Sequence, residues 1–205
     1  GTEINGQGPK IGEDKVQLLM ERLDALSGGD VLFLSGSIPS TMSNDVYRRI
    51  MERLHGKGVQ IVVDATKELL VNVLPYHPFL IKPNNYELGE IFHVKLTSRE
   101  EVVPYGVKLQ KMGAENVLIS MAGEGAVLIA ADGSVMEEAA PAGTLKNGVG
   151  AGDSMVAGFM AGWLESRDYR HAFHLGMAAG SASAFSEHLA TREEIEAVYR
   201  QILGT

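Results

Sequence analysis

Short apolar runs alternate with longer amphipathic stretches along most of the chain. Val31–Leu34 is entirely apolar, which predicts a strand that is buried on both faces of a parallel sheet. In the stretch before it, Val16, Leu19, Met20 and Leu23 recur at helical spacing. The same patterns predict strands over residues 31–34, 59–63, 79–81, 117–120, 126–130 and 135–139. Helices are predicted over residues 12–26, 43–55, 67–74, from about 84, over 98–112, from the glycine-rich segment near 150, over 169–186 and from 191.

The alternation of strands with helices predicts an α/β fold, a doubly wound and mostly parallel sheet with helices on both faces. The last two strands are joined by Asp132-Gly133, so we expect them to form a hairpin at the edge of the sheet. Ligands of such sheets bind beyond the carboxyl ends of the strands. Four loops follow such ends, and we expect them to share one crevice: residues 35–39, 64–67, 82–87 and 120–125.

Composition narrows the functional classes. The 205 residues are 45% hydrophobic and 21% charged, as in an ordinary soluble globular domain. A formal net charge of −8 argues against a nucleic-acid surface, so anionic ligands would need locally placed donors. The absence of cysteine excludes disulfides and thiolate chemistry. No apolar run reaches membrane length, and we therefore expect a cytoplasmic protein.

The most informative segment is Asn147–Asp153, which reads Asn-Gly-Val-Gly-Ala-Gly-Asp. Its alternating glycines leave backbone N–H groups uncovered, and the small and apolar residues after it predict a buried helix. An uncapped helix N-terminus favours anions through its free donors and its dipole. Asp153 stands at the same place, where a carboxylate can act as a general base on a hydroxyl group.

Other interpretations of this segment are simpler or different. A tight turn with Asp153 as an ordinary helix-start residue is about as common as a site. No Lys-Ser/Thr pair follows, which excludes a Walker loop. Asp153 also occupies the position of the third glycine of a dinucleotide fingerprint, which disfavours an NAD-dependent oxidoreductase.

Asn84 and Glu87 form a second candidate site, because they lie three residues apart at a predicted helix start and can face one point. An amide oxygen and a carboxylate are hard ligands that suit Mg²⁺. The simpler alternative is a helix cap with an acidic first turn.

The turn from Ser120 to Gly125 is a third candidate. Ser120, Gly123 and Gly125 could surround a nucleotide phosphate with backbone donors, although a plain turn fits the spacing equally well.

Taken together, these segments resemble the ribokinase-like (pfkB) carbohydrate kinases. The resemblance rests on Asn147–Asp153, Lys82–Glu87 (Lys-Pro-Asn-Asn-Tyr-Glu), Ser35–Pro39 (Ser-Gly-Ser-Ile-Pro) and the Ser120–Gly125 turn, which occur in the family's order and spacing. Thr2-Glu3-Ile4-Asn5 and the Lys-Pro-Asn form of the second segment resemble the hexose-phosphate branch of the family. The resemblance implies transfer of the ATP γ-phosphoryl group to fructose 1-phosphate, which yields fructose 1,6-bisphosphate, with tagatose 6-phosphate as the alternative acceptor.

The resemblance also implies a role for each candidate residue. Asp153 would be the catalytic base, and the amides of Gly150, Ala151 and Gly152 would hold developing charge. Asn84 and Glu87 would place Mg²⁺, directly or through water. Nucleotide contacts would come from Ser120, Gly123, Glu124, Gly125, Asn147, Gly148, Gly150 and Gly152. The sugar would contact Ser35, Gly36, Ser37 and Asp153.

The sequence departs from the family pattern in two respects. Relatives begin with a further stretch of roughly a third of a chain, which holds the first core strands, most of a β-lid and much of the sugar site. Residues 1–205 would then be the C-terminal two-thirds of one kinase domain, with residues 1–9 as the remnant of a lid strand and turn. Asp64–Lys67 also differs from the usual Asp-x-Ser-Gly.

These departures lead to further expectations. We expect little activity from the fragment alone, and the resemblance implies a homodimer for the full-length protein. A catalytically inactive nucleotide-binding fragment is the rival interpretation.

Overall fold

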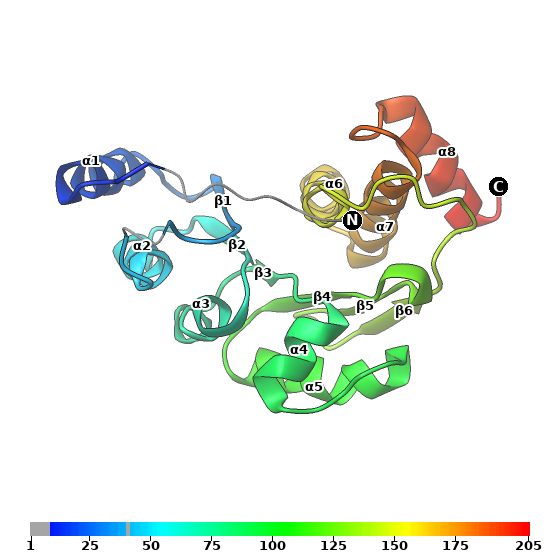
Figure 1. The fold of residues 1–205 in the computed structure, drawn as a ribbon, viewed down its shortest axis with the longest axis horizontal. Helices are drawn as coiled ribbons and strands as arrows, with labels where there is room; N and C mark the ends of the chain where they lie inside the picture. The colour runs from blue at the N-terminus through cyan, green and yellow to red at the C-terminus, as the bar shows by residue number, and fades with distance from the viewer. Residues whose placement is uncertain (1–8, 40–41) are drawn as a thin grey trace. The chain divides into compact units, whose positions relative to one another are not determined.

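The computed structural model describes residues 9–39 and 42–205, which divide into two compact units. Unit 1 comprises Gly1–Ile81 with Met112–Glu115, and unit 2 comprises Lys82–Lys111 with Asn116–Thr205. Figure 1 labels the helices and strands of both units. The predicted lid remnant falls almost entirely on residues 1–8, outside the described part of the chain.

Unit 1 is built on three parallel strands. Val31 pairs with Gln60, and Val62 pairs with Leu80, so the strands follow one another in chain order. The strands are β1 (Val31–Ser35), β2 (Gln60–Asp64) and β3 (Leu80–Ile81). The helices of unit 1 are α1 (Glu13–Leu23), α2 (Val46–Leu54), α3 (Lys67–Val71) and the 3-10 turn η1 (Leu74–Tyr76).

Two predictions for unit 1 were wrong in detail. Strand β1 is not buried on both faces, because Phe33 is 44% exposed. The helix predicted over residues 67–74 ends at Val71, and a separate 3-10 turn follows. Pro75 explains the break, since its ring lacks a donor and conflicts with the carbonyl group four residues earlier, that of Val71.

Unit 2 contains three antiparallel strands, which confirms the predicted hairpin. They are β4 (Asn116–Ser120), β5 (Ala126–Ile129) and β6 (Val135–Glu138). Helices α4 (Asn85–Phe92) and α5 (Arg99–Lys111) lie on one side of these strands in Figure 1, and α6, α7 and α8 lie on the other. Their bounds are Ala151–Ser166, Tyr169–Phe185 and Arg192–Leu203, and η2 spans Ala122–Glu124. Helices on both faces confirm the α/β class.

Helix α8 starts at the capping box that its sequence predicts. The Thr191 hydroxyl accepts from the Glu194 backbone N–H, and the Glu194 carboxylate accepts from the Thr191 N–H at 2.7 Å. In this motif two backbone N–H donors at the helix start are satisfied reciprocally.

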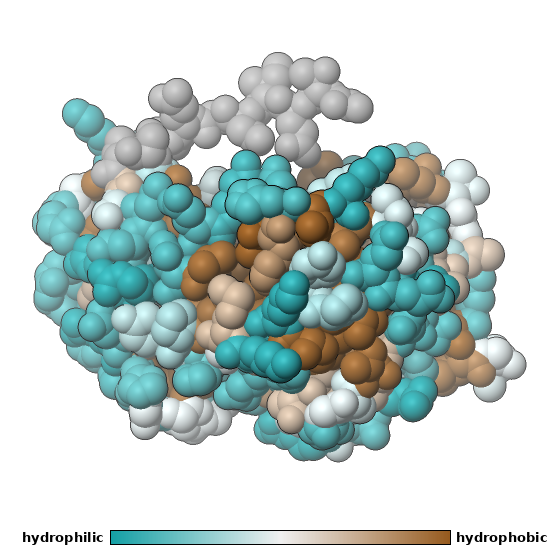
Figure 2. Space-filling view, turned by 90° about the horizontal axis from the view of Figure 1, so that it is seen from below, coloured by the Kyte–Doolittle hydropathy of each residue, from teal (hydrophilic) through white to brown (hydrophobic). Residues whose placement is uncertain are grey.

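The outer surface mixes hydrophilic residues with apolar ones (Figure 2). No helix within residues 9–39 and 42–205 is long and apolar enough to cross a membrane.

Glycine and alanine bring α6 and α7 into close contact. A methyl group built on Gly158 would lie 2.7 Å from the Ala179 Cβ and 2.7 Å from the Leu175 carbonyl oxygen. Phe159 is fully buried on the same helix. The small residues of α7 therefore serve helix packing, and this packing fixes the helix that carries Asp153.

We predict that Gly158→Ala destabilises the protein by about 1–3 kcal/mol, because overpacking outweighs the roughly 1 kcal/mol gain in helix propensity. The midpoint of urea unfolding measures the change. Ala157→Ser adds one atom at the exposed neighbouring position and should stay within about 0.5 kcal/mol of the parent. Equal losses in the two variants would contradict the close helix contact.

Candidate functional site

Two of the predicted site loops meet in unit 2. The Ser120 backbone N–H donates to the Pro83 carbonyl at 3.2 Å, and Asn84 forms an isolated parallel bridge with Ser120. These contacts hold the start of the Lys82–Glu87 segment against the end of β4. The two loops thus share one edge of the unit, as the sequence predicts for carboxyl ends of neighbouring strands.

The same segment also contacts the glycine loop, through Lys82. Its side chain is almost fully buried, with 6% of the residue exposed. A methyl group built on Gly152 would lie 3.2 Å from the Lys82 Nζ, so the ammonium group lies directly beside the first turn of α6. Lys82–Glu87 therefore lies between the Ser120 turn and the glycine loop, and three loops far apart in sequence come together.

The glycine loop ends at an open helix N-terminus. Gly150 is the N-cap of α6 in the left-handed conformation (φ 79°), which favours glycine, and no side chain caps the helix. Asp153 lies in the first turn with its side chain exposed. Backbone donors without a capping side chain and an accessible carboxylate are thus adjacent, as an anion site with a base requires.

One predicted N–H donor of this loop, that of Ala151, already makes a hydrogen bond within the loop. The Ala151 N–H donates to the Gly148 carbonyl at 3.3 Å, as part of the turn that starts the helix. The prediction that the amides of Gly150, Ala151 and Gly152 hold an anion stays a prediction, with the Ala151 N–H also engaged inside the turn. The amides on either side of Ala151 remain the better candidates.

Asn147 ties the loop to the segment after α7. Its side-chain amide donates to the Glu187 carbonyl at 3.1 Å, and its Oδ1 accepts from the Val149 N–H at 3.0 Å. Its backbone N–H donates to the Ala184 carbonyl at 3.2 Å. Asn147 therefore shapes the loop, a role that its sequence position alone did not distinguish from nucleotide contact.

Asn84 and Glu87 form a capping box at the start of α4. The Asn84 Oδ1 accepts from the Glu87 N–H at 2.9 Å, and the Glu87 Oε2 accepts from the Asn84 N–H at 2.8 Å. The capping alternative is thus present in the structure. It does not exclude magnesium, since each oxygen keeps a further lone pair and Glu87 has a second carboxylate oxygen. Among the described residues no three His, Cys, Asp or Glu side chains cluster as a metal site.

The Ser120 turn offers fewer donors than its sequence suggests. The N–H groups of Met121, Glu124 and Gly125 donate to carbonyls within the turn, and that of Ser120 donates to Pro83. A nucleotide contact would therefore depend on other groups of the turn, such as Gly123, where an added methyl group would meet only open space.

Ser35, Gly36 and Ser37 belong to unit 1 and are exposed at the end of β1. Their assignment to the sugar stays a prediction from the sequence.

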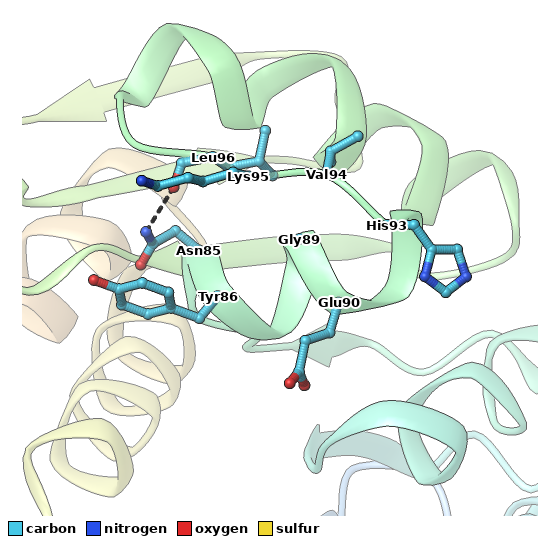
Figure 3. A pocket seen from close by; sticks show the side chains of 8 residues that line it. All are labelled: Asn85, Tyr86, Gly89, Glu90, His93, Val94, Lys95 and Leu96. Carbon is cyan, nitrogen blue, oxygen red and sulfur yellow. Dashed lines mark hydrogen bonds between the residues drawn. The ribbon is translucent and has the colours of Figure 1, made fainter.

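A hollow of about 380 Å³ lies beside α4 and the loop that follows it (Figure 3). The Asn85 side-chain amide donates to the Leu96 carbonyl at 2.8 Å across it. Its lining consists of Asn85, Tyr86, Gly89, Glu90, His93, Val94, Lys95 and Leu96. Neither Asn84, Glu87 nor the glycine loop takes part, so this hollow is separate from the candidate site.

Lys82 is the site residue that sequence reasoning missed. In the sequence the lysine of Lys-Pro-Asn indicates one branch of the family, but it has no predicted role in a site. A signal was available, because Lys82 directly follows the apolar run of β3 and precedes Pro83 at a strand's carboxyl end, where a charged side chain is unusual unless it is used.

Comparisons with known proteins show the family of the chain. The chain matches the pfkB family of carbohydrate kinases over residues 1–195 and belongs to that family. It is 45% identical over 204 residues to the 1-phosphofructokinase of Bacillus subtilis, which covers all of this chain and 67% of that relative. The D-tagatose-1-phosphate kinase of Bacillus licheniformis is 33% identical, with 98% of this chain and 66% of the relative covered.

Solved structures show the same fold. Phosphofructokinase-2 from Escherichia coli in complex with fructose-6-phosphate superposes with a TM-score of 0.85 at 25% identity, over 94% of this chain and 63% of that one. Arabidopsis thaliana ribokinase, complexed with ribose and ATP, reaches a TM-score of 0.70 at 16% identity, over 94% of this chain and 61% of that one, and supports the fold alone. The chain thus spans about two-thirds of the length of these relatives.

We predict that Asn147→Ala speeds amide hydrogen exchange at Val149 about two- to tenfold, because that amide loses its side-chain acceptor. Exchange followed by mass spectrometry or NMR measures the rate. Asn85→Ala removes another asparagine side-chain bond outside the loop and should leave Val149 unchanged. The same acceleration in the Asn85 variant would contradict a local tether.

Proposed function

We propose that this chain contains the nucleotide and catalytic residues of an ATP-dependent kinase that phosphorylates fructose 1-phosphate to fructose 1,6-bisphosphate, a 1-phosphofructokinase. The observation that carries the proposal is the open N-terminus of α6, with the exposed Asp153 carboxylate in its first turn and the Lys82 ammonium beside Gly152. Positive charge and a base at one place suit phosphoryl transfer, in which positioning and charge stabilisation dominate.

The proposed step uses the residues of this site in distinct roles. A hydroxyl oxygen of the acceptor attacks the γ-phosphorus of ATP and forms the new P–O bond. The bond from that phosphorus to the oxygen bridging the β-phosphate breaks, and ADP leaves with the electron pair. Asp153 accepts the hydroxyl proton, while the Gly152 amide and Lys82 stabilise the charge on the transferred group.

Magnesium fits the oxygen donors of Asn84 and Glu87. Mg²⁺ keeps several waters and binds through few carboxylates, which agrees with a carboxylate that also caps a helix. If held there, the ion would offset negative charge on the phosphates of ATP.

The choice of acceptor rests on the relatives. The more similar relative reported above is a 1-phosphofructokinase, and the D-tagatose-1-phosphate kinase favours a tagatose phosphate as the second candidate. A coupled assay of ADP release with the full-length protein separates fructose 1-phosphate, tagatose 1-phosphate, tagatose 6-phosphate and fructose 6-phosphate. Equal rates on all four would contradict the fructose 1-phosphate assignment.

Self-association of the full-length protein as a homodimer stays a prediction.

We predict that Asp153→Asn in the full-length protein lowers turnover by about 10²-fold or more, because the amide cannot accept the proton. ATP affinity should change little, since the amide retains the shape of the side chain. Steady-state kinetics and calorimetric titration measure the two quantities. Unchanged turnover would remove Asp153 from the role of base.

We predict that Glu87→Gln raises the Mg²⁺ concentration needed for half-maximal rate by roughly tenfold. Glutamine can still close a capping box, so the helix is kept while the charge is removed. Glu194→Gln makes the identical change in the capping box of α8 and should shift the requirement less than about twofold. A similar shift in both variants would assign the effect to helix capping.

A further inference from the structure

Beyond the residues already assigned, the loop after β1 has an anchor of its own. The Tyr47 hydroxyl, in the first turn of α2, donates to the Ser35 carbonyl at 2.8 Å and approaches the Gly36 carbonyl at 3.3 Å. Tyr47 is half-buried, and Ile50 and Met51 of the same helix are buried in the core of unit 1. The hydroxyl is therefore presented from a fixed element.

A second bond holds the other side of the same peptide group. The Gly36 N–H donates to the Asp64 carbonyl at 2.9 Å, at the end of β2. In a trans peptide the C=O and N–H point in opposite directions. The peptide between Ser35 and Gly36 is thus held from both sides, by Tyr47 and by Asp64, and cannot rotate without losing both bonds.

The orientation of the next peptide group, between Gly36 and Ser37, is also restricted. Its carbonyl, that of Gly36, faces the Tyr47 hydroxyl, so its N–H, that of Ser37, is directed away from the tyrosine. Ser37 is exposed. A backbone donor with a fixed direction at the carboxyl end of a parallel strand is suited to an oxygen of a bound ligand.

We propose that Tyr47 is a positioning residue for the acceptor: it sets the direction of the Ser37 amide toward a hydroxyl or phosphate oxygen of the sugar phosphate. This inference rests on the proposed function, and it adds a residue that touches no substrate itself. The surroundings agree, since burial and the nearby Asp64 carboxylate raise the pKa of Tyr47 and keep its proton available for donation.

Tyr47→Phe in the full-length protein tests the proposal, because it removes only the hydroxyl and keeps the ring. We expect the KM for the acceptor to rise about three- to tenfold, with kcat and the KM for ATP within about twofold of the parent. Hydrogen exchange at the Gly36 amide should accelerate, since its peptide group loses one of its two anchors. A purely structural role would change both KM values together or neither.

Tyr199→Phe is the matched control. It also removes a tyrosine hydroxyl that makes a hydrogen bond, here to the His171 Nδ1 at 2.7 Å, and it should leave the acceptor KM unchanged. An unchanged acceptor KM in Tyr47→Phe, with Gly36 exchange accelerated, would overturn the inference, whereas ADP release by the full-length parent decides separately whether the protein is a kinase. Unchanged Gly36 exchange would overturn the anchoring geometry.

Discussion

The candidate site depends on one electrostatic constraint, the contact between a buried lysine and the start of a helix. The Lys82 ammonium and the N-terminal dipole of α6 carry charge of the same sign, and Lys82 is shielded from most water. Both therefore present donors or positive charge near Gly152. An anion bound at that point would interact favourably with each of them, which is the physical basis of the proposal for a phosphoryl group there.

This constraint holds only because α6 is rigidly placed. Gly158, Gly176 and Gly180 allow α6 and α7 to approach until backbone atoms touch, and an added methyl group at Gly180 would lie 3.0 Å from the Ala151 carbonyl. The interface thus reaches the first residue of α6. Asn147 then holds the preceding loop through hydrogen bonds to the Ala184 and Glu187 carbonyls, at the end of α7 and just after it.

The sequence predicts the helices and strands well. It predicts less well which side chains are exposed and which backbone amides are already hydrogen-bonded. Apolar periodicity and capping residues located α8 at Thr191 and the hairpin at Asp132-Gly133, because these signals are local. The break at Pro75 and the exposure of Phe33 depend on a ring clash and on a strand's neighbours, which periodicity does not register. Residue spacing also does not show which backbone N–H groups of a turn donate to carbonyls of the same turn. The hydrogen bond from the Ala151 N–H to the Gly148 carbonyl is therefore not predictable from the sequence.

Capping boxes show why context rather than motif defines a site. Asn84 with Glu87 and Thr191 with Glu194 make the same reciprocal pair of bonds, each with the carboxylate 2.7–2.8 Å from the cap N–H. Only the first pair lies in a segment that contacts both the Ser120 turn and, through Lys82, the glycine loop. The capping box of α4 thus lies in a segment joined to two other candidate loops, whereas the Glu194 carboxylate caps α8 and accepts from the Ser186 hydroxyl at 2.9 Å. The reciprocal bonds are the same, and only the surrounding segments distinguish the two carboxylates.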